Sequence, residues 1–250
     1  MVISNVTVLA PPHAANTDAI DPSICRNVLI TKCRIDVGDD NVAIKSGHKV
    51  EGRKFACENI TVTDCVFLHG HGMSIGSETA GGVRNVTVRN CTFENTENGI
   101  RIKSQRGRGG VVENISYSDI TMKNVNPAIT LTCFYAYNSA GDSKQQSTPK
   151  PDVAQPVTDK TPIYRNIHIN NLKATCQKSA GMILGLPESQ ISDVVLENVT
   201  ITAATTGLAI QNAKGIQFKN VQVINKEGPP FIVNAAQVEG LEAVKNTQRK

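Results

Sequence analysis

Short apolar segments alternate with polar turn residues along this chain, and no segment repeats its apolar positions every 3.6 residues. One pattern recurs: asparagine, an apolar residue, any residue and a second apolar residue. The steps between successive copies are 22, 32, 26, 29, 52, 27 and 22 residues. Short β-branched segments with a period of 20–30 residues predict a solenoid of strands. The copies begin at Asn5, Asn27, Asn59, Asn85, Asn114 and Asn166, with weaker copies at Asp193 and Gly215.

A second apolar segment follows most copies after 13 to 15 residues. The absence of a 3.6-residue period argues against helical solenoids. We therefore expect an all-β fold, a single-stranded right-handed parallel β-helix of about eight coils, with each strand stacked on its copy in the preceding coil. The asparagines are expected to satisfy backbone groups at the turns. The second segments begin at Asn41, Gly72, Asn98, Pro127, Gly181 and Gly207.

The repeat also predicts how the chain is organised. One β-helix domain is expected over residues 1–236, and a loop at about 136–162 accounts for the 52-residue step because it lacks apolar periodicity. Residues 237–250 are polar and are expected to form a cap or tail. A strand already begins at Asn5, with no capping element before it, so we expect the solenoid to have further coils before residue 1.

Composition and charge exclude several classes of protein. The chain has 26 Lys+Arg and 22 Asp+Glu, and this net charge of +4 requires neither nucleic acid nor a membrane as a partner. No uncharged apolar run approaches the length of a membrane span, and residues 1–20 do not resemble a signal peptide. No Cys/His spacing or acidic loop predicts a metal site, so no cofactor is expected. We expect a monomer.

The cysteines are predicted to be reduced. Cys33, Cys65 and Cys91 occupy the same position of the repeat, which predicts an interior stack of free thiols. Cys25 and Cys57 also stack one coil apart, near enough for a disulfide, but reduced thiols are favoured there as well.

Aligning the second segments on Ile44, Ile75 and Ile102 brings polar residues into one row. Asp40, His71 and Asn98 then fall in register in consecutive coils, and Asp39 falls over Gly70. Asp18, at the turn entering another apolar strand, lies one coil before Asp39. Since Ile100 and Ile102 point inward, Arg101 and Lys103 share the outward face.

This row suits the hydrolysis of glycosides. Such hydrolysis needs a carboxylic acid to protonate the leaving oxygen and a carboxylate to activate water. Three carboxylates about one coil apart would repel one another, which should raise one pKa and supply a protonated acid. Arg101 and Lys103, about 10 Å away, could bind a carboxylate of the substrate.

Four motifs of the chain resemble, in order, those of the family 28 glycoside hydrolases, the polygalacturonases. They are Asn16-Thr-Asp18, Gly38-Asp39-Asp40, Gly70-His71-Gly72 and Arg101-Ile-Lys103. The resemblance implies inverting hydrolysis of α-1,4 bonds between galacturonic acid units of pectin, in an extracellular or periplasmic location. It implies that Asp39 is the acid, that Asp18 and Asp40 activate water and that His71 supports the site. Asn16, Arg101 and Lys103 would bind substrate. The family usually has glycine where this chain has Ala19.

Other interpretations remain open at this point. A pectate lyase shares the architecture but would use calcium and an arginine base, and a rhamnogalacturonan hydrolase would use a related site. A non-catalytic β-helix that binds carbohydrate would retain its function when Asp39 and Asp40 are replaced. The plain alternatives are that Gly38-Asp39-Asp40 is a solvated turn, that Asn16 and Asp18 form an Asx-turn, and that Arg101 and Lys103 form a solvated strand face.

Overall fold

The computed structural model describes residues 1–47, 55–135 and 153–241, and almost all of its regular structure is β-strand. Every ladder that joins two of the strands is parallel. The strands are β1 (Val2–Ser4), β2 (Thr7–Leu9), β3 (Arg26–Thr31), β4 (Arg34–Asp36), β5 (Val42–Ile44), β6 (Cys57–Thr63), β7 (Val66–Leu68), β8 (Met73–Gly76), β9 (Val83–Glu94), β10 (Ile100–Lys103), β11 (Val111–Val125), β12 (Ile129–Thr132), β13 (Ile163–Cys176), β14 (Gly181–Leu184), β15 (Ile191–Ala203), β16 (Leu208–Ile224) and β17 (Phe231–Glu239).

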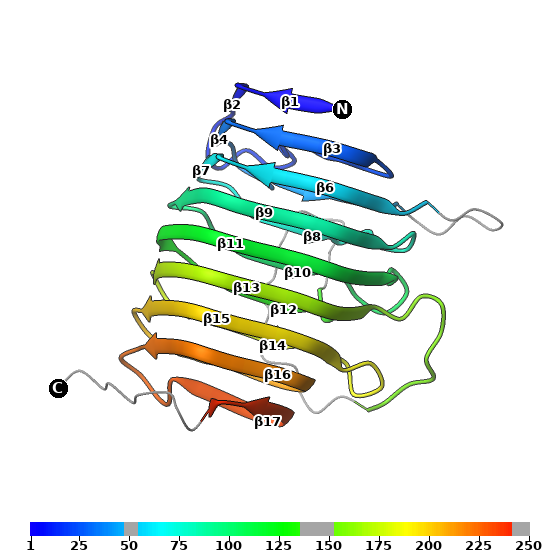
Figure 1. The fold of residues 1–250 in the computed structure, drawn as a ribbon, viewed down its shortest axis with the longest axis vertical. Helices are drawn as coiled ribbons and strands as arrows, with labels where there is room; N and C mark the ends of the chain where they lie inside the picture. The colour runs from blue at the N-terminus through cyan, green and yellow to red at the C-terminus, as the bar shows by residue number, and fades with distance from the viewer. Residues whose placement is uncertain (48–54, 136–152, 242–250) are drawn as a thin grey trace.

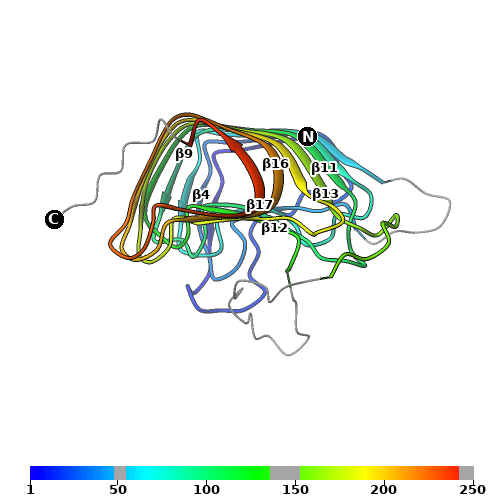
Figure 2. The same cartoon turned by 90° about the horizontal axis from the view of Figure 1, so that it is seen from below.

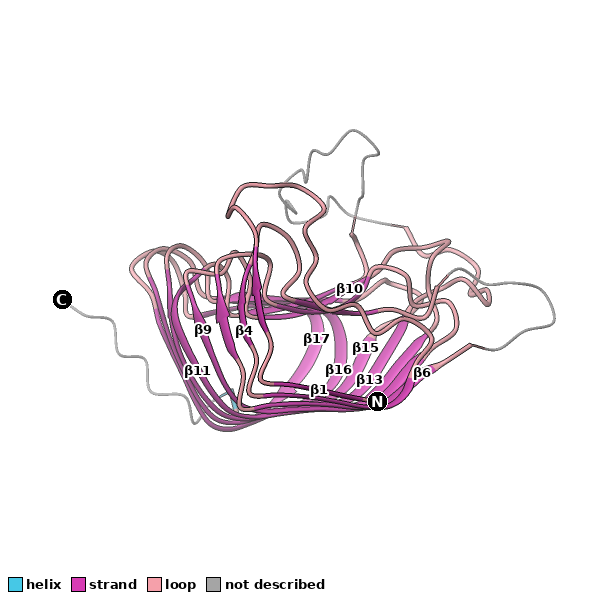
Figure 3. Cartoon of the chain, turned by 90° about the horizontal axis from the view of Figure 1, so that it is seen from above, coloured by secondary structure: helices cyan, strands magenta, loops and turns pink. Residues whose placement is uncertain are grey.

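Each strand pairs with its counterpart in the next coil, so the chain is a parallel β-helix, as predicted. One wall runs from β1 through β3, β6, β9, β11, β13 and β15 to β16 (Figure 1). A second wall, which matters for function, contains β5, β8, β10, β12, β14 and the first part of β16. The first wall has one strand segment in each coil, and the described chain agrees with about eight coils. Figure 2 and Figure 3, views along the axis, show the strands superposed as walls around a common interior.

Stacked apolar side chains fill this interior. Ile30, Val62, Val88 and Tyr117 occupy equivalent positions of β3, β6, β9 and β11, and all four are completely buried. Burial of a large aliphatic side chain contributes about 1.5–3 kcal/mol, so repetition over many coils stabilises the whole shaft. Cys33, Cys65 and Cys91 form the predicted stack of buried thiols, and all seven cysteines are free, including Cys25 and Cys57.

The repeated asparagines mark bends in the first wall. Asn27, Asn59, Asn85, Asn114 and Asn166 all have φ between 53° and 59°, a left-handed conformation that asparagine tolerates better than β-branched residues do. We expected their side chains to satisfy turn backbone, but they bond to one another. From Asn59 onward, the Nδ2 atom of each donates to Oδ1 of the asparagine in the preceding coil at 2.7–3.0 Å. Parallel stacking in register places successive amides within this reach.

The structure refines the predicted boundaries. Residues 153–162 contain no strand and β13 begins at Ile163, whereas residues 136–152 lie outside the described part, so the insertion at about 136–162 stays a prediction. The expected end of the β-helix at residue 236 is too early, because β17 continues to Glu239 and pairs with β16. Residues 242–250 of the predicted tail are likewise not described. Among the described residues, no helix has the length and apolar character needed to span a membrane.

Candidate active site

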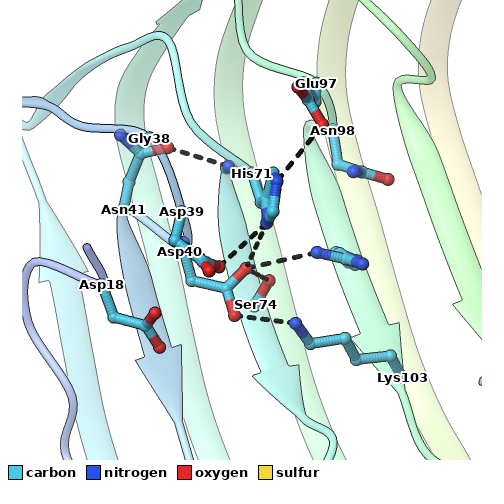
Figure 4. Close-up of polar contacts among 12 residues, drawn as sticks. Asp18, Gly38, Asp39, Asp40, Asn41, His71, Ser74, Glu97, Asn98 and Lys103 are labelled. Carbon is cyan, nitrogen blue, oxygen red and sulfur yellow. Dashed lines mark hydrogen bonds and ion pairs between the residues drawn. The ribbon is translucent and has the colours of Figure 1, made fainter. Parts of the chain in front are cut away.

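The register of the second wall brings the predicted site residues together. Val42 of β5 pairs with Met73 of β8, which pairs with Ile100 of β10. The residues two places earlier therefore align as Asp40, His71 and Asn98, as the sequence predicted. A bridge between Ile20 and Val42 places Asp18 beside Asp40 in the preceding coil. The side chains of Asp18, Asp39, Asp40 and His71 gather at the entry to these strands (Figure 4).

Asp40 is the most enclosed carboxylate of the site, with a side chain only 3% exposed. Its Oδ1 accepts hydrogen bonds from Ser74 Oγ at 2.6 Å and Arg101 Nη1 at 3.3 Å, and its Oδ2 lies 2.7 Å from Lys103 Nζ. Burial alone would raise the pKa of Asp40, but the positive charges of Lys103 and Arg101 outweigh it and hold the pKa below its usual range. Asp40 is therefore ionised at neutral pH.

The contacts of Asp40 correct the expected position of the cations. We expected Arg101 and Lys103 about 10 Å from the carboxylates, two coil spacings away. Both side chains instead reach across the intervening coil and contact Asp40 directly. They are also buried, so the plain alternative of a solvated strand face is wrong. Burial and the neighbouring Arg101 charge lower the pKa of Lys103, which shows that this position is unfavourable for a cation.

Asp39 is paired with His71. Its Oδ1 lies 2.9 Å from His71 Nδ1 and also accepts the Asp40 backbone N–H, while its Oδ2 accepts the Asn16 backbone N–H at 3.2 Å. Burial would raise the pKa of Asp39, but the hydrogen bond and charge of His71 outweigh it and hold the pKa well below its usual range. The expected raised pKa is therefore wrong for Asp39 and for Asp40, because neither had been expected to contact a cation.

His71 bridges two carboxylates. Its Nε2 lies 3.2 Å from Oε2 of Glu97, opposite the Asp39 contact on Nδ1. Burial would lower the pKa of His71, but the hydrogen bonds to Asp39 and Glu97 outweigh this and raise it to about 9. His71 is therefore an imidazolium at neutral pH, and it holds a proton next to Asp39.

Asp18 belongs to a second ion pair on the same wall. Lys45, which follows β5, places its Nζ 2.9 Å from Asp18 Oδ2 and 2.6 Å from Asp21 Oδ2. The two carboxylates outweigh the effect of burial on Lys45 and hold its pKa above the usual range. Burial, opposed by the hydrogen bond from Lys45, raises the pKa of Asp21 to about 6. The raised pKa therefore belongs to Asp21, a residue outside the four motifs.

Asn16 supports the site through its backbone. It has a φ of 55°, and its N–H donates to Asp39. The neighbouring Thr17 Oγ1 accepts the Gly38 N–H at 2.9 Å. The turn of one coil thereby fixes the Asp39 turn of the next. The predicted contact of the Asn16 side chain with substrate stays a prediction.

A tyrosine covers the two cations. The ring of Tyr135 lies with its centroid 5.5 Å from Arg101 Cζ and 5.1 Å from Lys103 Nζ. Cations at this distance are attracted to the π face of the ring. Tyr135 therefore adds a half-buried aromatic surface beside the charged row.

The donor set does not fit a resident metal ion. Asp39, Asp40 and His71 do bring potential ligand atoms within 4.8 Å of one another. However, Lys103 and Arg101 already contact Asp40, and both ring nitrogens of His71 already face carboxylate oxygens, of Asp39 and Glu97. These three residues are ion-pair partners of one another and of the cations.

Five contributing residues were missed in the sequence: Ser74, Lys45, Asp21, Glu97 and Tyr135. Alternation could have revealed Ser74 and Lys45, because both lie at outward positions of the second wall. Asp21 and Glu97 carry no comparable signal, since their contacts depend on where Lys45 and His71 point.

Fold and site together define a parallel β-helix protein with carboxylates arranged for acid–base chemistry. The chain belongs to the glycosyl hydrolases family 28, whose model matches residues 1–223. This confirms the resemblance drawn from the four motifs.

Two solved structures resemble the chain closely enough to show the same fold. A hyperthermoactive exopolygalacturonase from Thermotoga maritima is 30% identical with a TM-score of 0.66, covering 93% of this chain and 47% of that one. A polygalacturonase from Erwinia carotovora ssp. carotovora is 31% identical with a TM-score of 0.59, covering 95% and 50%.

Sequence relatives give the same family. An endo-polygalacturonase of Pectobacterium carotovorum subsp. carotovorum is 46% identical over 129 residues, which are 52% of this chain and 31% of that protein. A probable polygalacturonase of Arabidopsis thaliana is 31% identical over 250 residues, 98% of this chain and 48% of that protein. The chain thus spans half or less of the length of these relatives.

Proposed function

We propose that the protein hydrolyses α-1,4 bonds between galacturonic acid units of polygalacturonan, with inversion and outside the cytoplasm. The observation that best supports this is the group of three carboxylates, Asp18, Asp39 and Asp40, beside Arg101 and Lys103 on one wall. Acid–base chemistry needs the carboxylates, and a polymer of sugar acids needs fixed cations. The printed names of the relatives, which are polygalacturonases, support the same substrate.

Asp39 would protonate the leaving oxygen, with His71 as the source of its proton. Asp39 is ionised in the free protein, but the adjacent imidazolium carries a proton on Nδ1, which lies 2.9 Å from Asp39 Oδ1. That proton first passes from His71 Nδ1 to Asp39 Oδ1, and Asp39 then donates it to the departing sugar oxygen, which leaves Asp39 ionised and His71 neutral. The pair thus acts as one acid that holds a single proton, and solvent returns a proton to His71 before the next turnover.

Asp40 and Asp18 would activate the attacking water. Both are held against lysines, Asp40 by Lys103 and Asp18 by Lys45, so each carboxylate is fixed in place. The base accepts the proton of the water as the new bond forms at the anomeric carbon. An inverting enzyme keeps room for this water between acid and base.

Arg101 and Lys103 would bind a galacturonate carboxylate while they also contact Asp40. Arginine has five N–H donors, and the contact with Asp40 is made through Nη1. The Tyr135 ring would pack against the sugar beside them.

The direct test measures release of reducing ends from polygalacturonate in the presence of EDTA. We expect release by the parent protein and a loss of at least about 100-fold in Asp39→Asn, the size of a general acid–base effect. A matched control is Asp36→Asn. Asp36 also pairs with a histidine, His69, at 2.8 Å, and neither residue has a role in the proposed reaction; its replacement should leave activity unchanged.

Other outcomes would support other functions. An unsaturated product that requires calcium would indicate a lyase, and release from rhamnogalacturonan alone would indicate the related hydrolase. A folded parent that binds polygalacturonate without cleaving it would favour a binding protein and contradict the proposal.

Sedimentation would test whether the protein is the expected monomer.

A further inference from the structure

Glu97 lies at the edge of the site, in a row of three aligned residues whose middle member is a glycine. The register that aligns Asp40, His71 and Asn98 also aligns Asp39, Gly70 and Glu97. Two backbone bonds tie the row together, from His71 N to Asp39 O at 2.9 Å and from Glu97 N to Gly70 O at 2.7 Å. Asp39 and Glu97 are therefore two coils apart, with a glycine between them.

The turn that precedes His71 requires glycine. Gly70 has a φ of 76°, and a Cβ built there would lie 2.4 Å from the Asp39 carbonyl oxygen. Only glycine fits this turn without displacing backbone. His71, the next residue, places its ring between the two carboxylates, with Nδ1 toward Asp39 and Nε2 toward Glu97 (Figure 4).

Both ring nitrogens of His71 face carboxylate oxygens, which constrains its protonation state. An ionised carboxylate only accepts hydrogen bonds, and only the imidazolium has an N–H on both nitrogens. The contacts at 2.9 Å and 3.2 Å are thus both satisfied when His71 is charged, whereas a neutral ring would leave one carboxylate without its donor.

Four charged groups surround His71, and their distances and pairing indicate which of them favour a proton on its ring. Asp39 is at 2.9 Å, Asp40 at 3.9 Å and Glu97 at 3.2 Å, and Arg101 is the cation that opposes them. Arg101 and Lys103 already neutralise Asp40. Asp39 and Glu97 therefore supply most of the attraction for a proton on the ring.

Glu97 can be altered without disturbing the core. Its side chain is 67% exposed, compared with 20% for His71 and 3% for Asp40. The hydrogen bond to His71 lowers the pKa of Glu97, so Glu97 is ionised over the range in which His71 titrates.

We propose that Glu97 is a positioning residue that holds the His71 imidazolium against Asp39 and thereby sets the alkaline limit of catalysis. This rests on the proposed function, in which the Asp39–His71 pair donates the proton to the leaving oxygen. Glu97 acts through His71 and does not touch the reacting atoms. The Asp39–His71 pair would keep its proton at pH values at which an unperturbed histidine is already deprotonated.

The first test follows the His71 ring by NMR and does not depend on activity. The parent and Glu97→Gln are titrated from pH 5 to pH 11, and the His71 signal is identified by its absence in His71→Gln. We expect the parent ring to titrate near pH 9 and Glu97→Gln to titrate at least about one unit lower, the usual effect of removing an opposite charge at this distance. An unchanged titration overturns the proposal, whether or not the protein is active.

The second test follows the pH profile of kcat/KM. In Glu97→Gln the alkaline limb should move to lower pH by the same amount as the NMR titration, with the acidic limb unchanged. A merely structural role would lower activity equally at every pH. The matched control is Glu94→Gln, three residues earlier, which removes a surface pair with Lys123 and should leave both limbs in place. A shift of the same size in the control overturns the proposal.

Discussion

Two rows of charged side chains cross the coils of this protein, one on each wall, and they differ in how each charge is satisfied. In the first wall, Glu58 lies in register between Arg26 and Arg84 and contacts both, at 2.8 Å and 2.7 Å. The arginine side chains are 62% and 45% exposed. Each pair joins adjacent coils and remains in contact with water.

The row in the second wall is buried and reaches further. Asp40 pairs with Arg101 and Lys103, which lie two coils away, and Ser74 of the intervening coil also bonds to it. All three charged side chains are at most 10% exposed. Transfer of such charges from water costs several kcal/mol per ion, whereas exposed pairs cost and contribute little.

This difference indicates what each row is for. An alternating exposed row follows from the repeat and adds modestly to stability. A buried carboxylate with two cations is a poor way to stabilise a solenoid, but it holds charges rigidly where the proposed hydrolysis would place a substrate anion and a water molecule. We interpret the second row as a functional site whose buried charges lower the stability of the fold.

The largest effect is expected from Asp40→Asn. The change removes the proposed base and leaves Lys103 and Arg101 buried beside a neutral amide. Activity should fall by about 10²–10⁴-fold, and the free energy of unfolding should fall by about 3 kcal/mol. Reducing-end release and urea unfolding measure the two effects. If Asp40→Asn is as stable as the parent, burial does not distinguish the energetics of the second row from those of the first.

A smaller effect is expected from Lys45→Met, since Lys45 is intermediate in exposure, at 23%. Asp18 and Asp21 would lose their shared cation, and a poorly placed Asp18 should lower kcat by up to about 100-fold with little change in KM. Lys45→Arg should restore part of kcat. Equal loss in the surface variant Lys123→Met would contradict a specific role.

Stability should depend on pH through the second row. The pKa of His71 is raised from 6.5 to about 9, so its contribution is complete below pH 6.5 and is lost as the pH rises through 9. The lowered pKa values of Asp39 and Asp40 contribute above about pH 4 and are lost in acid. Urea unfolding across this range should show a loss on the order of 2–3 kcal/mol on the alkaline side, absent in His71→Gln. If His71→Gln loses as much stability on the alkaline side as the parent, groups other than His71 cause that loss.

The smallest effect is expected in the first wall. Glu58→Gln should lower the free energy of unfolding by less than about 1 kcal/mol, with a smaller effect in high salt. Unfolding at low and high salt measures it, and activity should not change. A loss similar to that of Asp40→Asn would show that exposure does not separate the two rows.

The sequence was sufficient for the shaft and for the order of the site. Asparagine repeats gave the spacing of coils, and alternation of apolar residues gave the register that aligns Asp40 with His71. Both follow from local geometry, since strand side chains alternate with a period of two and stacked coils repeat the same bends. The same alternation placed Arg101 and Lys103 outward together.

Only the tertiary structure decided which charges meet. That Lys103 reaches Asp40 across a coil, that His71 turns its second nitrogen to Glu97 and that asparagine amides bond to one another depend on side-chain direction and length in three dimensions. The prediction that repulsion among the three carboxylates would raise one pKa fails for Asp39 and Asp40 for this reason, because it counted the carboxylates and left out the cations that contact them. Sequence period determines where the residues stand, and packing between coils determines the protonation states that make them chemically useful.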